Sequence, residues 1–160
     1  MERPPVTLRR MTDDEYRSWV DEVQARVVRE LLGTMPEEEA RATAAGGIAL
    51  YLPQGVATPR HTLVTAEDAA GRPVGNAWVG PDPHRADGSD AAWLYDIEVQ
   101  PRARRNGYGS AILAEVEALV VREGKTRLGL NVVGTNEAAI ALYLKHGYAV
   151  STMQMHKALT

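Results

Sequence analysis

The sequence contains no cysteine among its 160 residues. This absence excludes disulfide bonds, thiolate metal ligands and a cysteine nucleophile, and it makes a cytoplasmic protein the default expectation. Long apolar runs are also missing, since no stretch approaches the roughly 18–20 residues that a membrane-spanning helix needs. The net charge is only -3, so no bulk attraction to nucleic acid or to an anionic membrane is expected. The four histidines show no metal-ligand spacing, and no metal is expected.

The alternation of helical and strand-like periodicity predicts one domain over residues 1–160 with an α/β (α+β) fold. Its sheet should be mixed but largely antiparallel, with helices on both sides. The first helix should begin at Thr12 or Asp13 as its cap and end near Gly33. Gly46 and Gly47 should loosen the second helix, and residues 50–59 should form a loop. In order, we expect a strand at 6–11, helices at 13–32 and from 36, strands at 61–67, 73–79 and 94–99, a helix ending at 123, a strand at 127–133, a helix at 137–146, and closing strands at 148–150 and 153–157.

The stretch from 93 to 123 organises the chain. A strand, LYDIEV, is followed by the turn RARRNGYGS and then by a long amphipathic helix. Gly107 and Gly109 lie where the turn becomes the helix, and glycine lets a backbone approach a ligand closely. The first amides of a helix have no internal acceptors and carry partial positive charge. Together with Arg102, Arg104 and Arg105 they predict an anion site, best suited to a phosphate chain.

The residues of this turn argue against two other kinds of phosphate site. No Gly-Lys-Ser/Thr follows it, which argues against a nucleotide-hydrolysing P-loop, and Ile112 stands where a dinucleotide fingerprint requires a third glycine. A merely solvated arginine-rich turn stays open. A nucleic-acid patch ranks last and predicts a steep salt dependence of binding.

Two segments together carry a family resemblance. The first is V-x-P-x-x-R-x-x-G-x-G at 99–109, and the second is N-x-x-A-x-x-L-Y-x-x-x-G-Y at 136–148. This pairing resembles the GNAT superfamily of acyl-CoA-dependent N-acyltransferases, and the expected order of strands and helices fits that fold across nearly the whole chain. The resemblance implies that acetyl-CoA is the co-substrate and that the acetyl group passes directly to an amine in a ternary complex.

The resemblance also implies which residues bind the cofactor. Its pantetheine should lie beside Ile97, Glu98 and Val99, where neighbouring strands splay apart and leave backbone groups free. Arg104 belongs to the pyrophosphate-binding turn, and Asn136 is expected either to bind the pantetheine arm, to cap its helix, or both. The pyrophosphate should rest on the backbone amides of Arg105, Asn106, Gly107, Tyr108, Gly109 and Ser110.

Three side chains are candidates for catalysis. Tyr143 is the candidate general acid for the departing thiolate, because a phenol with a reference pKa near ~10 is protonated at neutral pH; taken alone, a tyrosine among leucines is more often core. Asp96 and Glu98 are the candidate bases, acting directly or through water. Strand alternation puts both on one face, although a bulge would separate them, and an ion pair or a solvated face is the alternative role.

The acceptor is expected to be a small molecule with a primary amine. A protein N-terminal or lysine acetyltransferase is the alternative, against which Asn131 argues mildly because such enzymes often carry Glu there. A non-catalytic acyl-CoA sensor of the same fold is the other alternative. A homodimer is possible, and neither the acceptor nor the acyl-chain preference can be read from the sequence.

Overall fold

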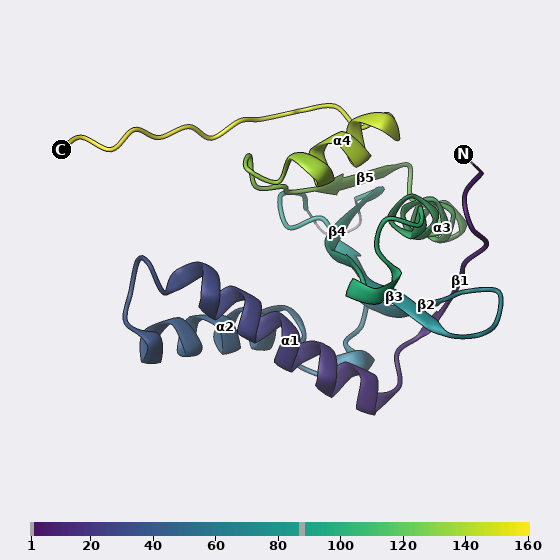
Figure 1. Cartoon of the computed structure of the whole chain (residues 1–160), viewed down its shortest axis with the longest axis horizontal. Helices are drawn as coiled ribbons and strands as arrows, with labels where there is room; N and C mark the ends of the chain where they lie inside the picture. The colour runs from purple at the N-terminus through teal and green to yellow at the C-terminus, as the bar shows by residue number, and fades with distance from the viewer. Residues whose placement is uncertain (1, 87–88) are drawn as a thin grey trace. The chain divides into compact units, whose positions relative to one another are not determined.

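The computed structural model describes residues 2–86 and 89–160, and its elements follow nearly the predicted order (Figure 1). The chain divides into two compact units, residues 1–130 and 131–160. The elements are β1 (Thr7–Arg10), α1 (Asp13–Leu31), α2 (Glu37–Tyr51), the 3₁₀ turn η1 (Gly55–Ala57), β2 (Thr62–Glu67), β3 (Pro73–Pro81), β4 (Ala91–Val99), the 3₁₀ turn η2 (Pro101–Ala103), α3 (Tyr108–Arg122), β5 (Arg127–Leu130) and α4 (Glu137–Lys145).

The five strands form one sheet in the order β1-β2-β3-β4-β5. The first three pairings are antiparallel and β4 pairs with β5 in parallel, so the predicted mixed, largely antiparallel sheet is confirmed. The register between β3 and β4 shifts once: Trp78 is opposite Asp96, whereas Val79 is opposite Leu94. Tyr95 is therefore the extra residue of a β-bulge. Beyond the bulge the alternation resumes, so Asp96 and Glu98 lie on one face, as the sequence predicts.

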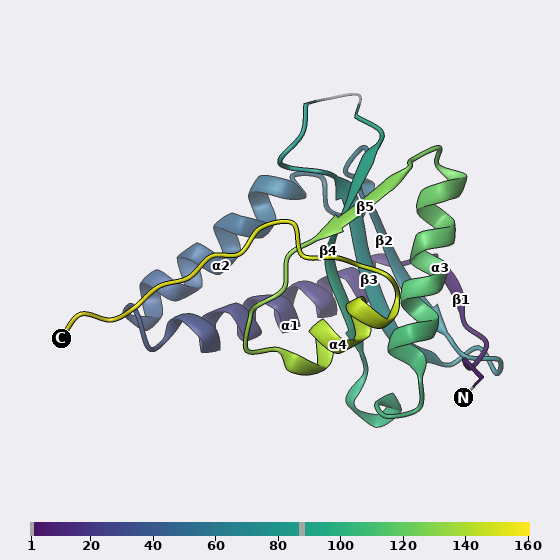
Figure 2. The ribbon, with the colours of Figure 1, turned by 90° about the horizontal axis from the view of Figure 1, so that it is seen from above.

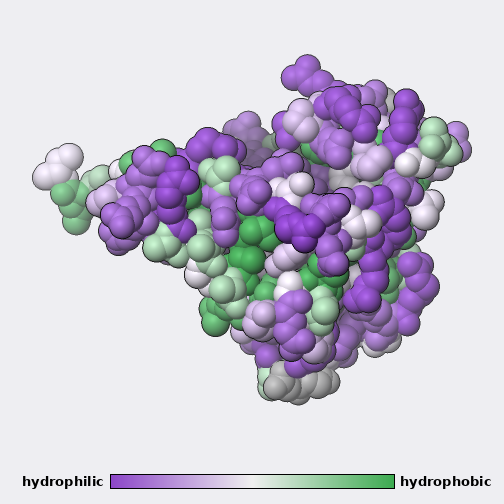
Figure 3. Space-filling view, turned by 90° about the horizontal axis from the view of Figure 1, so that it is seen from below, coloured by the Kyte–Doolittle hydropathy of each residue, from purple (hydrophilic) through white to green (hydrophobic). Residues whose placement is uncertain are grey.

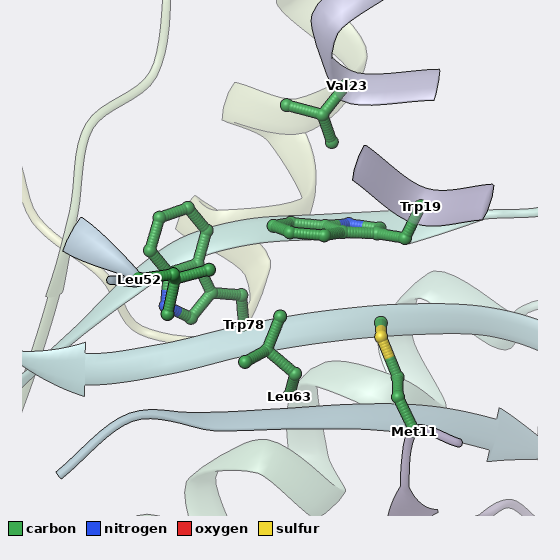
Figure 4. Packing of buried hydrophobic residues seen from close by; sticks show 6 residues of the cluster. All are labelled: Met11, Trp19, Val23, Leu52, Leu63 and Trp78. Carbon is green, nitrogen blue, oxygen red and sulfur yellow. The ribbon is translucent and has the colours of Figure 1, made fainter. Parts of the chain in front are cut away.

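Helix α1 covers the face of the sheet that carries these acids. Thr12 is its N-cap, because its hydroxyl accepts from the backbone amide of Glu15 while the Glu15 carboxylate accepts from the amide of Thr12, which is a capping box. Trp19 is 3% exposed and meets Trp78 of β3 edge to face, with ring centroids 5.5 Å apart. Figure 4 shows these two rings with their neighbours Met11, Val23, Leu52 and Leu63 between helix and sheet. Two buried indoles supply much of the apolar area that fixes α1 here.

Helix α2 packs against α1 through Ala40 and Ala44, which meet Val28. The prediction that Gly46 and Gly47 loosen this helix is wrong, because the helix continues through both to Tyr51, and only η1 interrupts the loop that follows. The physical reason is that these glycines are surrounded by good helix formers, so their intrinsic cost of about 1 kcal/mol each is tolerated once the alanine face is anchored.

Helix α3 covers the opposite face of the sheet (Figure 2). Its residues Ile112, Leu113 and Val116 are fully buried. The helix approaches β3 so closely that a Cβ placed on Gly75 would lie 2.7 Å from Ile112 Cδ1 and would also overlap the carbonyl oxygen of Glu98. The predicted helices on both sides of the sheet are thus present within the first unit.

The second unit corrects part of the prediction. The predicted closing strands at 148–150 and 153–157 are wrong, because the described residues from 148 to 160 contain neither helix nor strand. A strand needs a partner for its backbone groups and a buried side to anchor it, whereas Met153 and Met155 are 73% and 83% exposed. The strand predicted at 127–133 also ends early, at Leu130.

The face in Figure 3 is largely hydrophilic with smaller hydrophobic areas. In the described part of the chain, no helix combines the length and apolarity that crossing a membrane requires.

Candidate active site

The turn between β4 and α3, where the anion site is predicted, contains two residues with a left-handed backbone. Gly107 is the N-cap of α3 with φ 81°, and Arg105 has φ 63°. The left-handed region is uncommon for a residue with a side chain, so Arg105 is held there by its surroundings. The α3 hydrogen-bond ladder begins with the Ala111 amide donating to the Gly107 carbonyl. The amides of the first turn, from Tyr108 to Ser110, therefore precede that ladder at the positive end of the helix dipole, as the sequence predicts.

Side-chain hydrogen bonds to backbone carbonyls stabilise this turn. The Asn106 amide nitrogen donates to the carbonyl oxygens of Ala103 and Arg104, at 3.2 and 2.9 Å. Arg104 in turn donates to the Val99 carbonyl oxygen at 3.1 Å and to Glu98 Oε1 at 3.3 Å. The guanidinium of Arg104 thus lies between the end of β4 and the turn, where it can serve an anion. The Asn106 side chain shapes the loop, and only its backbone amide is left as a candidate donor to a ligand.

The pairing of β4 with β5 ends before β4 itself does. Among the described residues, the ladder between β4 and β5 runs from Ala91 opposite Arg127 to Leu94 opposite Leu130. Ile97, Glu98 and Val99 lie beyond that ladder and pair with β3 only. Backbone groups of this segment that face away from β3 are therefore not used by β5, and the binding of pantetheine beside them stays a prediction.

Asp96 and Glu98 meet one arginine of α1. Arg26 donates through one guanidinium nitrogen to Asp96 Oδ1 at 2.9 Å and through another to Glu98 Oε2 at 3.1 Å. Trp19 Nε1 donates to the second oxygen of Asp96 at 3.1 Å. Burial alone would lower the pKa of Arg26, but the charge and hydrogen bond of Asp96 and the charge of Glu98 raise it, so Arg26 stays protonated. The ion-pair role that the sequence left open is present for both acids.

The sequence motifs indicate neither Arg26 nor the indole N–H of Trp19 as part of this site. The ring of Trp19 is buried in the core, while its N–H reaches Asp96. The contacts join residues 70 to 77 positions apart. The available signal was an arginine on the helix that covers two neighbouring strand acids, and it becomes visible only when the packing is known.

A groove of about 900 Å³ runs between α1 and the strands β3 and β4. Glu98 lines it, together with Arg26 from α1 and Asn76 from β3, whereas Asp96 is only 11% exposed and lies outside the lining. The volume falls within the range of small-molecule sites, about 300–1,000 Å³. The other lining residues are Met11, Asp14, Glu15, Ser18, Trp19, Glu22, Ala25, Arg29, Thr65, Pro73, Gly75, Gln100, Pro101 and Arg102.

In the second unit, helix α4 carries the remaining two candidates. Asn136 is the N-cap of α4, and its side-chain oxygen accepts from the Ala139 amide at 3.2 Å. The capping role is therefore present, and a role in pantetheine binding stays a prediction. Tyr143 is half-buried on α4, and its ring meets that of Tyr148 edge to face at 5.6 Å. Its role as general acid stays a prediction as well.

Two half-buried polar rings of the first unit have structural partners. His61 Nδ1 accepts from Trp78 Nε1 at 3.0 Å, and burial lowers its pKa, with Arg60 acting in the same direction. Tyr95 donates its hydroxyl to the Pro81 carbonyl oxygen at 2.6 Å, and burial raises its pKa to about 12. The described residues contain no group of three or more His, Cys, Asp or Glu side chains arranged to hold a metal ion.

Comparisons with known proteins identify the family and the fold. The model of the Acetyltransferase (GNAT) family matches residues 26–148. The uncharacterized N-acetyltransferase YdgE of Bacillus subtilis (strain 168) is 26% identical over 155 residues, which are 96% of this chain and 98% of that protein. The crystal structure of YycN from Bacillus subtilis has a TM-score of 0.88 and 26% identity, covering 98% of this chain and 99% of the other. The PaiA N-acetyltransferase of Thermoplasma acidophilum, in complex with coenzyme A, has a TM-score of 0.67 over 94% and 93% of the two chains; at 14% identity this likeness shows the fold alone.

Proposed function

The chain belongs to the GNAT acetyltransferase family, and from that premise we propose that it transfers the acetyl group of acetyl-CoA directly to the primary amine of a small molecule. The observation that supports the proposal is that the predicted anion-binding turn and an acid-containing groove both lie at the end of one strand, β4. Acetyl-CoA supplies an activated thioester, so the chain needs no nucleophile of its own, and the lack of cysteine agrees with this.

The turn fits the diphosphate of CoA. Its backbone amides lie at the positive end of α3, and Gly107 supplies the left-handed backbone (φ 81°) from which that helix starts. Arg104 and Arg105 add positive charge beside these amides. The segment of β4 from Ile97 to Val99, which lies beyond the pairing with β5, would offer backbone donors and acceptors to the amide groups of pantetheine, as a neighbouring strand would.

Of the two acids on β4, we assign the role of base to Glu98. Its carboxylate lines the groove, so an amine or a bridging water in the groove can reach it. Asp96 is nearly buried and accepts from both Trp19 and Arg26, and it therefore supports the site without touching the acceptor. Tyr143 is the proposed acid that protonates the departing thiolate of CoA.

The acceptor proposal rests on the groove. A cavity of about 900 Å³ has the size of a small-molecule site and suits an amine of modest size. The lining offers carboxylates of Asp14 and Glu22 to a cationic amine in addition to Glu98. A protein acceptor is the alternative, and peptides with a free N-terminus or a lysine serve as its probe.

The proposal is tested by following release of free CoA thiol from acetyl-CoA with a panel of small polyamines, amino acids, aminoglycosides and peptides. Direct transfer predicts intersecting double-reciprocal plots when both substrates are varied, whereas parallel lines indicate a covalent acetyl-enzyme. Glu98→Gln should lower kcat by about 10²-fold or more, as expected on removal of a general base. Turnover with peptides alone favours the protein acceptor, and binding of acetyl-CoA without turnover on any amine identifies a sensor.

A further inference from the structure

Arg26 is the one residue in the described part of the chain shown to contact both carboxylates of β4. Its guanidinium reaches Asp96 and Glu98 at 2.9 and 3.1 Å from a helix that is 70 and 72 positions away in sequence. We propose that Arg26 is a positioning residue of the acetyl-transfer site, which fixes the orientation of the Glu98 carboxylate toward the acceptor groove. This inference rests on the proposed function.

The contact with Asp96 holds the guanidinium of Arg26 in one orientation. Its side chain is 11% exposed, and a carboxylate so nearly buried needs a counter-charge and hydrogen-bond donors. Trp19 Nε1 holds one oxygen and Arg26 holds the other. Because Trp19 is itself packed in the core at 3% exposure, Asp96 cannot turn freely, and the guanidinium plane of Arg26 is set by it.

The second arm of Arg26 then sets Glu98. Arg26 donates to Oε2 of Glu98, and Arg104, from the turn that follows β4, donates to Oε1 at 3.3 Å. Strand alternation alone would place two like charges about 7 Å apart along β4, from twice the rise per residue, and they would repel each other. The positive charge of Arg26, which donates to both carboxylates, offsets that repulsion. A carboxylate has about four acceptor positions, so Glu98 keeps capacity for an amine N–H or a water.

The charges around Glu98 define what removal of Arg26 should do. The groups that face Glu98 are Arg26 from α1, Arg104 from the turn, Asp96 from its own strand and the neutral Asn76 from β3. Glu30 of α1 acts on Arg26 as a further negative charge. Without Arg26, the Glu98 carboxylate keeps the Arg104 contact at Oε1 and loses its hydrogen bond at Oε2, so it can turn away from the groove. The other charged groups that line the groove are Asp14, Glu15, Glu22, Arg29 and Arg102.

The test compares Arg26→Gln and Arg26→Lys with Arg41→Gln. Arg41 lies on α2 outside the groove lining and pairs at the surface with Glu37, so its replacement removes the same charge away from the β4 acids. Arg26→Gln should lower kcat by about 10²-fold, the size expected for a misplaced catalytic group. The KM for acetyl-CoA should stay near its wild-type value, because Arg26 lies outside the turn assigned to the cofactor. Arg41→Gln should leave both kcat and KM as in the wild type.

Arg26→Lys separates position from charge. A lysine keeps the cation but cannot bridge two carboxylates with a planar fork, so it should restore only part of the kcat lost in Arg26→Gln. If Arg26→Gln does not fold, this variant alone carries the test, and its kcat should lie several-fold below that of the wild type. Calorimetric titration with CoA should give unchanged affinity for the folded Arg26 variants. A wild type without transfer activity refutes the proposed function, whereas an active wild type with Arg26 variants that match Arg41→Gln in kcat and KM overturns the positioning role.

Discussion

Replacing Gly107 by valine tests the anion-binding turn most sharply. Gly107 has φ 81° at the start of α3, and a Cβ there would lie 3.2 Å from Pro4 Cδ. Forcing a residue with a side chain into the left-handed region costs roughly 1–2 kcal/mol. Relief of that strain requires the turn to change its backbone angles, and the first amides of α3 then no longer converge on one anion. Affinity for CoA should therefore fall at least about tenfold, which corresponds to about 1.4 kcal/mol.

Gly124 supplies a matched control at the other end of the same helix. Its φ of 79° is nearly that of Gly107, and a Cβ there would meet nothing within 4 Å. Valine at either position should lower the Tm by about 2–8 °C, since 1–2 kcal/mol corresponds to about that shift in a chain of this size. Only Gly107→Val should weaken CoA in a calorimetric titration. Equal CoA affinity in the two variants and the wild type would refute the assigned turn.

Three further predictions address other parts of the molecule. Tyr143→Phe should lower kcat by about 10²-fold while the Kd of acetyl-CoA changes less than about twofold, measured by thiol release and calorimetry; unchanged kcat would return Tyr143 to the core. Arg9 hydrogen-bonds the Glu15 carboxylate and lowers its pKa from 4.5 to about 2, so the folded state binds this proton less tightly than the unfolded chain. The stabilisation, roughly 1–2 kcal/mol after solvent screening, is present above about pH 4.5 and is lost as the pH falls toward about 2; in Glu15→Gln that part of the pH dependence should vanish from denaturant titrations. Gly75→Val should cost about 1–3 kcal/mol or prevent folding, because a Cβ would overlap the Glu98 carbonyl oxygen; a Tm within 2 °C of wild type would contradict the close packing of α3.

Local signals predicted the ends of several elements well. The hydroxyl of Thr12 caps α1, and the helices predicted to end at 123 and 146 are followed by Gly124 and Gly147 in the left-handed conformation, with φ 79° and 88°. These positions depend on nearby residues only, so the sequence carries them directly. The same holds for the turn at Gly107, where glycine spacing and the start of an apolar helical stripe coincide.

Long-range packing decided the parts that sequence reasoning missed or got wrong. Whether Asp96 and Glu98 each pair with a cation depends on where α1 lies. No residue near Arg26 in the sequence indicates that its partners are on β4. The predicted strand at 153–157 failed for a related reason, since its alternating Met153 and Met155 gain a buried side only if another segment supplies one. An alternating pattern makes a segment compatible with a strand, but the strand forms only when another segment pairs with it.

The most direct test of the account is a calorimetric titration of the protein with acetyl-CoA and CoA, with ATP as a nucleotide control. The account predicts saturable binding of acetyl-CoA and CoA at one site per chain and no comparable binding of ATP, because the turn and the open edge of β4 together fit a diphosphate with its pantetheine arm. Absence of binding by both acetyl-CoA and CoA would contradict the assigned site, and the proposed acetyl transfer would fall with it.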